Sequence, residues 1–284
     1  MYPFDFPDPD VLFVGGTYYA YGTNSAGGNI QIISSTDLVN WHLVGDALPR
    51  EPSWAVPGAT WAPAVIDLGG NFLMYYTTTT LFGSQCISVA SSGGPQGPFL
   101  DESSGPLVCQ TSDGGSIDPS PYQDGAGNLY LTWKSIGGSL PATIWSQPLS
   151  SNGDAMSGSP AVLLQPTESW EGGIVEAPTM VLVDGQYYLF FSGSNWDSSQ
   201  YAIGVARCQG PTGPCSEALG QPLLTSEAGF SGPGGPAIFT DSGGSLWMAF
   251  AAWLPGSVGY PNARLLFLRR LTFASGVPQI GSSS

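Results

Sequence analysis

FPDPDVLFV, residues 6–14, is the first of five related stretches whose recurrence decides the fold. The others are TWAPAVIDL at 60–68, SIDPSPYQD at 116–124, VEAPTMVLV at 175–183 and GPGGPAIFT at 232–240. Each stretch has a proline at the start of an apolar run, and successive prolines are 54 to 59 residues apart: Pro9, Pro63, Pro119, Pro178 and Pro236. A period of this length indicates an array of structural repeats.

A second apolar run follows each stretch after a turn of small residues. These runs are GGTYYAYGT (15–23), GGNFLMYYT (69–77), AGNLYLTWK (126–134), DGQYYLFFS (184–192) and GGSLWMAFA (243–251). Further runs, such as NIQIISS at 29–35 and YAIGVAR at 201–207, bring the count to roughly four short strands per repeat. We therefore predict an all-β, five-bladed β-propeller.

Length and composition favour one domain over residues 1–281. The 40 glycines and 25 prolines punctuate the chain at turn spacing, and no stretch shows the 3.6-residue apolar period of a long helix. We expect the serines at 282–284 to begin a linker or tail. Because a closed propeller exposes little sheet edge, we expect a monomer.

The net charge of the chain excludes some classes of binding partner. Only six residues are Lys or Arg, and the formal net charge is −15. Nucleic acids and anionic membranes attract basic surfaces, so neither is an expected partner. A chain that is poor in charge and rich in Ser, Thr, Gly and aromatic residues has the composition of many secreted proteins that act on neutral polysaccharide.

The four cysteines form two close pairs along the chain, Cys86 with Cys109 and Cys208 with Cys215. Three disulfide connectivities are possible, and four free thiols are the alternative. We favour two disulfides between the close pairs, because no CxxC or nearby histidine suggests metal ligation. This pattern predicts an oxidising compartment. No leader or membrane span is visible, so we expect a secreted protein from which the leader has been removed.

Acids stand beside three of the repeated prolines: Asp8, Asp118 and Glu176. In a propeller, equivalent positions of successive blades lie at one depth around a common axis, so these carboxylates are expected to converge. Turn chemistry is the alternative, because Asp suits turns and Pro suits strand starts. The neighbouring acids Asp5, Asp10 and Glu171 are interpreted as solvated or as supporting the trio.

With these motifs, in this order and spacing, the chain resembles glycoside hydrolase family 43. The resemblance covers nearly the whole chain and rests on FPDPDV, TWAP, SIDPSPY, VEAPTM and GPGGPAIF. It implies a five-bladed propeller that cleaves arabinose- or xylose-containing polymers with inversion. It also implies that Asp8 is the general base, Glu176 the general acid and Asp118 the residue that tunes and orients the acid.

Inversion requires water activated on one face of the sugar and protonation of the leaving oxygen on the other. The two carboxyls stand about 6.5 to 9.5 Å apart in such enzymes, so that the water fits between them. Asp8 must be ionised and Glu176 protonated. A nearby ionised Asp118 is expected to help keep the acid protonated.

Sugar recognition is expected from aromatic faces and hydroxyl-binding groups. Trp61 is the strongest candidate, and core packing is the alternative for the other possible walls: Phe6, Trp133, Trp170 and Trp196. Trp247 and Trp253 are predicted to be core residues. By the resemblance, Arg264 lies near the reacting sugar, and a charge on the rim is its alternative. The only histidine, His42, is expected on the surface.

Two departures from the family pattern concern binding. Ala64 follows Trp-Ala-Pro where many relatives carry an acid, so one polar contact near the substrate is expected to be missing. Gly235 stands where many relatives place a histidine near an axial metal ion. No cofactor is predicted, and a structural calcium ion has weak support.

The first functional hypothesis is an exo-acting α-L-arabinofuranosidase on arabinan or arabinoxylan of the plant cell wall. β-Xylosidase and endo-arabinanase activities are the alternatives within the family, because inter-blade loops decide between them. A non-catalytic sugar-binding propeller is an alternative of another class. A retaining β-fructosidase of similar fold is the third, although the expected Asn-Asp-Pro-Asn and Glu-Cys motifs are replaced by FPDPD and VEAP.

Overall fold

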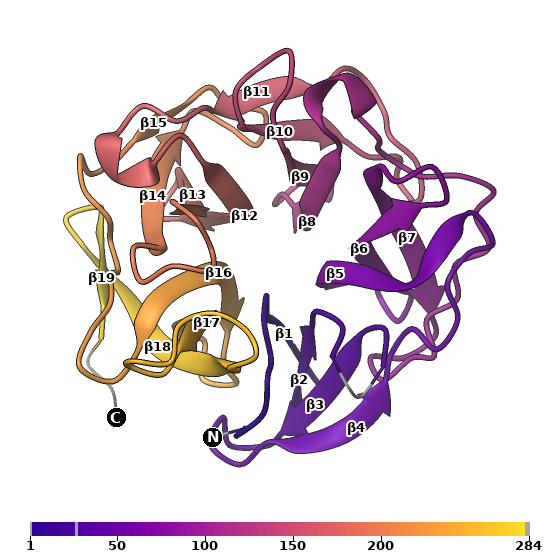
Figure 1. Cartoon of the computed structure of the whole chain (residues 1–284), viewed down its shortest axis with the longest axis horizontal. Coiled ribbons are helices and arrows are strands. Elements are labelled where there is room, and N and C mark those ends of the chain that lie inside the picture. Colours follow the sequence, from indigo (N-terminus) through magenta and orange to yellow (C-terminus); the bar gives the residue numbers. More distant parts are fainter. Residues whose placement is uncertain (1, 26–27, 282–284) are drawn as a thin grey trace.

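The computed structural model describes residues 2–25 and 28–281, and over these residues the chain forms five sheets around one axis (Figure 1). The suggested linker at 282–284 lies outside the described residues. The prediction of an all-β, five-bladed propeller is confirmed.

Each blade is a meander of antiparallel strands that follow one another in the sequence. The strands of blades 1 and 2 are β1 (Asp10–Val14), β2 (Thr17–Gly22), β3 (Gln31–Ser35) and β4 (His42–Asp46), then β5 (Ala55–Asp67), β6 (Phe72–Thr80) and β7 (Gln85–Ser92). Those of blade 3 are β8 (Ser116–Gln123), β9 (Leu129–Ser135), β10 (Thr143–Pro148) and β11 (Ala161–Leu164). Those of blades 4 and 5 are β12 (Val175–Val183), β13 (Gln186–Gly193), β14 (Ala202–Cys208) and β15 (Cys215–Glu217), then β16 (Ser231–Thr240), β17 (Leu246–Trp253), β18 (Arg264–Ala274) and β19 (Val277–Ile280).

Blade 2 departs from the expected four strands. Its sheet contains β5, β6 and β7, and a loop segment occupies the outer edge. Isolated bridges join this segment to β7 at Ser91–Leu100 and Ile87–Val108. Short 3₁₀ turns at Thr111–Asp113 and Ser169–Glu171 are the described helical elements.

Aromatic and aliphatic side chains fill the spaces between neighbouring blades. Tyr21 of blade 1 and Tyr76 of blade 2 are buried in one such cluster, and Phe190 and Phe250 are buried between blades 4 and 5. Full burial of a side chain of this size stabilises the fold by about 1.5–3 kcal/mol. The packed layers hold the inner strands at fixed radii, which positions their ends around the axis.

The segment before β1 closes the ring. It runs from the outside of the ring to the axis between blades 1 and 5 (Figure 1). The Phe6 amide donates to the carbonyl of Arg264 at 2.8 Å, and the buried Phe6 ring packs with Tyr2 in a cluster shared by the two blades. All four strands of blade 1 come from the start of the chain. The ring is therefore closed by side-chain packing between blades 1 and 5 and by the contacts of this short segment.

Both favoured disulfides are present. Cys86 bonds to Cys109, and Cys208 bonds to Cys215 across the β14–β15 hairpin. His42 is exposed on β4, the outer strand of blade 1, as predicted. Among the described residues, no helix is long and apolar enough to span a membrane.

Candidate active site

The residue before each repeated proline has a left-handed backbone. Its φ is 51° at Asp8, 43° at Ala62, 55° at Asp118, 49° at Ala177 and 65° at Gly235. Residues other than glycine seldom adopt this conformation, which costs on the order of 1–3 kcal/mol and concentrates at functional sites. Proline has no N–H for the ladder, and the strand pairing shifts register at this point in blades 2 to 5.

This bulge changes which side chains face the axis. In a regular strand, successive side chains point to opposite faces, but here Asp118 and the preceding Ile117 line the same cavity. Glu176 stands one residue before the left-handed Ala177, and both also line it. The three acids therefore occupy two repeat positions: Asp8 and Asp118 are equivalent, whereas Glu176 aligns with Trp61. The three acids meet in one cavity, as predicted, but the prediction that all three occupy equivalent positions of their repeats is wrong.

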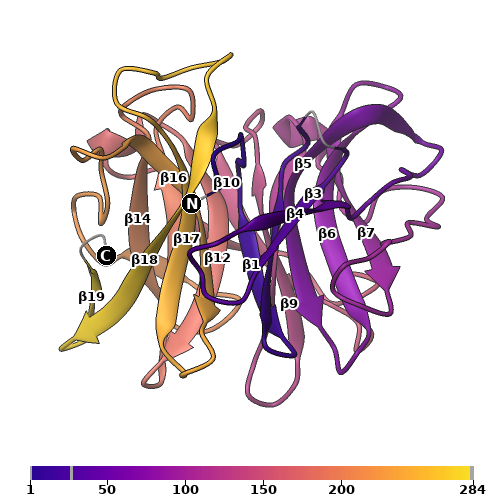
Figure 2. The same cartoon turned by 90° about the horizontal axis from the view of Figure 1, so that it is seen from below.

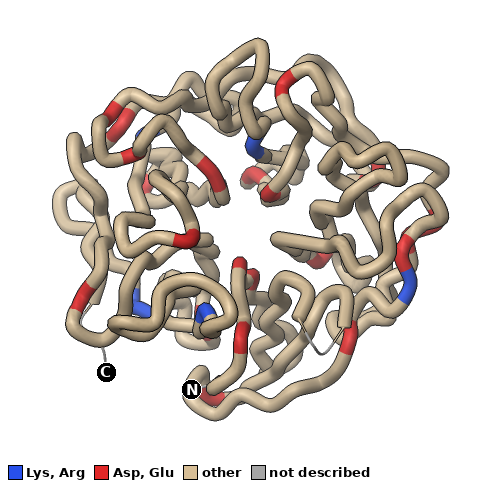
Figure 3. Tube along the Cα trace, viewed as in Figure 1, with Lys and Arg blue, Asp and Glu red and all other residues tan. Residues whose placement is uncertain are grey.

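A cavity of about 940 Å³ contains the predicted trio and lies at the end of the propeller where strands two and three of each blade are joined. The side view in Figure 2 shows these loops rising at one end of the ring. Trp196 and Tyr260 enter the cavity from the loops of blades 4 and 5, and Asn24 enters from that of blade 1. Acidic residues surround the central opening, where basic residues are few (Figure 3).

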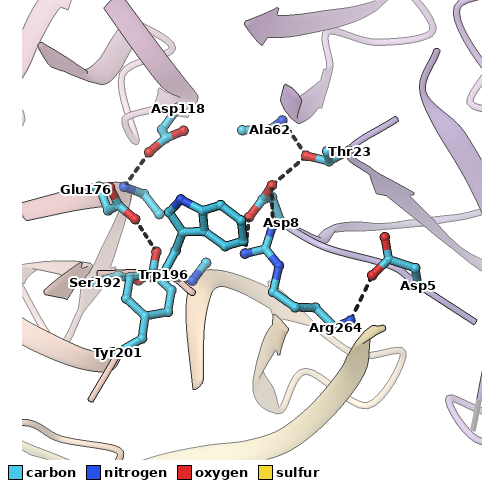
Figure 4. A network of polar contacts seen from close by, with 12 residues as sticks. Asp5, Asp8, Thr23, Ala62, Asp118, Glu176, Ser192, Trp196, Tyr201 and Arg264 are labelled. Atoms are coloured by element: carbon cyan, nitrogen blue, oxygen red, sulfur yellow. Dashed lines mark hydrogen bonds and ion pairs between the residues drawn. The ribbon is translucent and has the colours of Figure 1, made fainter. Parts of the chain in front are cut away.

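Asp8 is held by a hydroxyl and a guanidinium. Thr23 Oγ1 donates to Asp8 Oδ2 at 2.5 Å, while the Arg264 nitrogens donate to Oδ1 at 3.2 Å and Oδ2 at 3.4 Å. The Arg264 amide in turn donates to Asp5 at 2.7 Å, and its guanidinium lies 5.0 Å from the Trp196 ring centroid. Figure 4 shows this arrangement. A positive group fixed against both oxygens suits a carboxylate that acts as a base.

Glu176 has different partners on the other side of the cavity (Figure 4). Tyr201 donates its hydroxyl to Oε1 at 2.6 Å, and Lys134 donates Nζ to Oε2 at 2.7 Å. Lys134 and Glu176 are only 6% and 8% exposed. The two donors fix both oxygens of the Glu176 carboxyl in the cavity.

Asp118 lines the same cavity, and its pKa is raised. Burial raises its pKa to about 7, and the charge of Glu176 acts in the same direction, while Lys134 opposes both. Asp118 Oδ2 accepts from the Ala177 amide at 3.0 Å, which ties it to the strand that carries Glu176. The raised pKa makes Asp118 a group that can hold a proton beside Glu176, in addition to the charged role that the sequence analysis expects.

One inter-blade hydrogen bond recurs around the axis. The amide of the left-handed residue donates to the side chain that ends the second strand run of the preceding blade. The pairs are Ala62 to Thr23 (2.9 Å), Asp118 to Thr77 (3.0 Å) and Gly235 to Ser192 (2.9 Å). Lys134 occupies this position in blade 3 and pairs with Glu176, and the Asp118 carboxylate accepts the Ala177 amide instead.

The predicted sugar-binding residues divide into two groups. Trp61, Trp196 and Arg264 line the cavity. Phe6 and Trp170 do not, and their prediction as walls is wrong. Phe6 is fully buried between blades 1 and 5. The ring of Trp170 stacks on Phe191 and fills space left open by glycines at 193 and 204, where a Cβ atom would lie 2.5 and 2.6 Å from its nearest neighbours.

Other sequence-based interpretations are also corrected. Trp133 is buried and donates to Gln110, so it belongs to the core, as Trp253 does. Asp5 supports Arg264, as expected of a residue near the trio. Asp10 is half-buried: it accepts from the Val65 amide at 2.8 Å, and desolvation by burial raises its pKa to about 7. Glu171 is buried outside the cavity, where it accepts from the amides of residues 167 and 168.

The residues on the axis do not fit the calcium site that the family resemblance raised. A Cβ atom at Gly235 would lie in ordinary contact with Asp8 Cα at 3.4 Å, but the left-handed φ of 65° would strain a histidine or any other side chain there. Among the described residues, no group of three His, Cys, Asp or Glu is placed to hold a metal ion. Ala64 lines a small axial cavity of about 40 Å³ beside Asp8 and Asp118, outside the large one.

Sequence reasoning missed Lys134, Tyr201 and Thr23. The sequence contains two signals that could have found Lys134 and Thr23. Lys134 is the only lysine of the chain, and both residues stand at the end of the second apolar run of their repeat. Tyr201 gave no such signal, because only the folded chain brings it from the start of a later run to Glu176.

Comparison with known proteins agrees with this geometry. The family model described as glycosyl hydrolases family 43 matches residues 1–278. The chain belongs to this family. It is therefore a family-43 glycoside hydrolase, and the expectation from its motifs is confirmed.

Several relatives resemble this family-43 chain along most of its length. A probable arabinan endo-1,5-α-L-arabinosidase A of Aspergillus clavatus is 29% identical and covers 93% of this chain and 87% of its own. An extracellular endo-α-(1→5)-L-arabinanase 1 of Bacillus subtilis is 28% identical, with 91% and 78% covered. The crystal structure of a thermostable family-43 glycoside hydrolase is 28% identical, with a TM-score of 0.90 over 99% of this chain and 94% of that one.

Proposed function

We propose that this protein is an inverting glycoside hydrolase that cleaves α-L-arabinofuranosyl linkages in arabinan or arabinoxylan. The observation that carries the proposal is the difference between two carboxyls in one cavity. Asp8 is held by Arg264 and Thr23, and Glu176 by Lys134 and Tyr201. Such a pair can act as base and acid on opposite sides of a sugar.

In the proposed reaction, Asp8 accepts a proton from a water molecule, whose oxygen bonds to the anomeric carbon. Glu176 donates its proton to the glycosidic oxygen as the bond from that oxygen to the anomeric carbon breaks. The new bond forms on the opposite face, so the configuration inverts. Lys134 and Tyr201 stabilise the Glu176 carboxylate that results, and Asp118 is a proton-holding group beside it.

Removal of single arabinose units from chain ends is the first hypothesis for the mode of action. Trp196 and Tyr260 support it, because their loops raise a wall on one side of the cavity. Internal cleavage is the second candidate, and the names of the Aspergillus and Bacillus relatives favour it. β-Xylosidase activity is the third, because the carboxyl pair does not select the sugar.

We also propose that the protein is secreted and monomeric and acts on plant cell-wall polysaccharide. Two disulfides and a Bacillus relative named as extracellular support secretion. The four carboxylates in the cavity, against one guanidinium, favour a neutral polymer over an acidic one.

The test uses p-nitrophenyl α-L-arabinofuranoside, p-nitrophenyl β-xyloside, linear arabinan and arabinoxylan, with products separated by chromatography. We expect arabinose release, with the opposite anomer formed first in proton NMR. Asp8→Asn and Glu176→Gln should lower turnover of the polysaccharide by several orders of magnitude, while circular dichroism shows that both variants remain folded at the assay temperature. Retained anomeric configuration would refute inversion. Sugar binding without release from any substrate would establish the non-catalytic alternative.

A further inference from the structure

Ser192 ends the second apolar run of blade 4, at the repeat position that Thr23 and Lys134 occupy in blades 1 and 3. Thr23 binds Asp8 and Lys134 binds Glu176, so two of these positions already serve a proposed catalytic carboxyl. Ser192 is fully buried and lies outside the lining of the large cavity. Its part in the site therefore depends on the groups that its hydroxyl contacts.

A chain of hydrogen bonds leads from Ser192 to the proposed acid (Figure 4). The Gly235 amide donates to Ser192 Oγ at 2.9 Å. The Ser192 hydroxyl bonds to the Tyr201 hydroxyl, and Tyr201 donates to Glu176 Oε1 at 2.6 Å. The chain thus runs from the backbone of blade 5 through two side chains of blade 4 to one oxygen of the carboxyl.

The first donor fixes the direction of this chain. A backbone N–H can only donate, so Ser192 Oγ accepts from Gly235 and directs its own proton to Tyr201. The single hydroxyl proton of Tyr201 is then directed to Glu176. Burial and the charge of Glu176 raise the pKa of Tyr201 well above its ordinary value, and the hydrogen bond from Ser192 acts in the opposite direction. Tyr201 therefore keeps its proton, and remains a donor, at acidic and neutral pH.

Packing leaves the Tyr201 ring little freedom to leave the chain. Tyr201 is 3% exposed, and a Cβ atom at Gly234 would lie 1.8 Å from its Cε1 atom. The ring thus fills space that any side chain at Gly234 would occupy. Because the ring is fixed, the direction of the hydroxyl is the freedom that is left, and Ser192 sets it.

Both oxygens of Glu176 then receive a donor, Oε1 from Tyr201 and Oε2 from Lys134. A proton on this carboxyl must use a lone pair that neither donor occupies. Glu176 lines the cavity, where a leaving oxygen would meet that proton. If the Tyr201 hydroxyl pointed away from Glu176, it could accept the proton itself and turn it away from the substrate.

We propose that Ser192 is a positioning residue for the acid, which directs the Tyr201 hydroxyl to Glu176 and so keeps the acid's proton turned toward the leaving oxygen. The inference rests on the proposed function and adds a residue that acts on one of the two carboxyls. Gly235 packs beside Asp8, so an effect of Ser192 on the base is the alternative that the test must separate.

The test compares two leaving groups, because a sugar hydroxyl needs protonation far more than p-nitrophenol does. General acid catalysis contributes about 10²–10⁴-fold where it is needed. We expect Ser192→Ala to lower kcat about tenfold on linear arabinan and less than about twofold on p-nitrophenyl α-L-arabinofuranoside. Ser192→Thr should restore the rate, since blades 1 and 2 carry threonine at this position.

Ser146→Ala is the matched control. Ser146 is also fully buried on a strand, and its hydroxyl has no hydrogen-bond partner among the described residues. Its replacement should change neither rate. Equal losses on the two substrates in Ser192→Ala would overturn the proposal, because Ser192 would then act on the base or on folding.

A double-mutant cycle shows whether Ser192 acts through Tyr201. In the Tyr201→Phe background, Ser192→Ala should cause no further loss on arabinan, because the group that it directs is already absent. A further loss as large as that in the parent would overturn the proposal.

Failure of the proposed function has a separate readout, because the parent would then release no sugar from either substrate. The chain itself is measured without substrate by proton NMR, in which the buried Tyr201 hydroxyl gives a resonance that Tyr201→Phe removes. This resonance should shift in Ser192→Ala and stay in place in Ser146→Ala. No such resonance, or one that Ser192→Ala leaves unchanged, would overturn the proposal.

Discussion

Nζ of Lys134 lies 2.7 Å from Oε2 of Glu176, and both side chains are buried. Lys134 is also the only lysine of the chain, so the one ammonium side chain is placed against the proposed acid. It ends the second run of blade 3, where blades 1, 2 and 4 carry a hydroxyl residue that binds the backbone of the next blade. One substitution in a repeated position thus turns an inter-blade contact into part of the site.

Replacement of this ammonium should alter the pH profile as well as the rate. Lys134→Met removes the cation that lowers the pKa of Asp118, so that pKa rises above about 7. We expect kcat to fall about 10²-fold. The limb of the pH profile of kcat that reports the titration of Asp118 should move to higher pH. The pH dependence of kcat with p-nitrophenyl α-L-arabinofuranoside measures both effects.

Stability needs a control, because breaking a buried pair costs about 3–5 kcal/mol. Arg207→Met removes an exposed cation and should change neither the rate nor the pH profile. A Lys134→Met protein that is less stable but keeps the parental pH profile would show that Lys134 acts only in folding.

Thr23 is expected to position Asp8. Its hydroxyl donates to Asp8 and accepts from the Ala62 amide, so Thr23→Val leaves both groups without this partner at almost constant volume. We expect a drop of about 10- to 100-fold in kcat with a small change in KM, because a displaced base aligns the water poorly. Thr23→Ser should restore most of the rate.

Thr78→Val is the matched control for Thr23. Thr78 is fully buried near the end of β6, the second strand of the neighbouring blade 2, and its hydroxyl has no hydrogen-bond partner among the described residues. Its replacement should leave kcat unchanged and stability equal or higher. If Thr23→Val and Thr78→Val lose activity to the same extent, the loss at Thr23 comes from altered β-strand packing and not from the lost contact with Asp8.

The pKa values of the buried acids predict that stability decreases as pH rises. The pKa of Asp10 is raised from 3.8 to about 7, so the folded state binds its proton more tightly than the unfolded chain. This contribution is complete below pH 4 and is lost as pH rises through 7. Asp10→Asn should therefore match the parent near pH 4 and exceed its Tm at pH 8 by roughly 2–4 °C per kcal/mol regained.

Thermal unfolding between pH 4 and 9 measures this difference, with Asp197→Asn as an exposed control that should follow the parent throughout. A parent that grows more stable between pH 4 and 8 would contradict the sign of the argument. Glu217 adds to the same trend at higher pH, because burial raises its pKa to about 9.

The two disulfides should contribute unequally to stability. Cys86–Cys109 spans 23 residues and Cys208–Cys215 spans 7, so loop closure predicts about 3 and about 2 kcal/mol. Paired Cys→Ala variants compared by urea unfolding measure this. A larger loss for the short loop would mean that local packing at the β14–β15 hairpin outweighs chain entropy.

The order of residues alone predicts the blade count and the acids that meet on the axis, and it favours the two disulfide pairs that the structure contains. These features depend on periodicity and local chemistry, which the order of residues contains directly: five X-Pro stretches, glycine turns and paired cysteines. Radial symmetry then brings Asp8 and Asp118 together without further information. The sequence also identified Trp61, Trp196 and Arg264 as cavity residues by repeat position or family resemblance.

The surroundings of those residues depend on contacts between blades that lie far apart in the sequence. Phe6 and Trp170 are core residues, because packing between blades and the space above two glycines set their direction. Tyr201 and Lys134 meet Glu176 from two different blades, and no local pattern encodes that contact. The bulge at each X-Pro pair sets which of two successive side chains reaches the cavity. Long-range packing, not the order of residues, determines the protonation and orientation of the site.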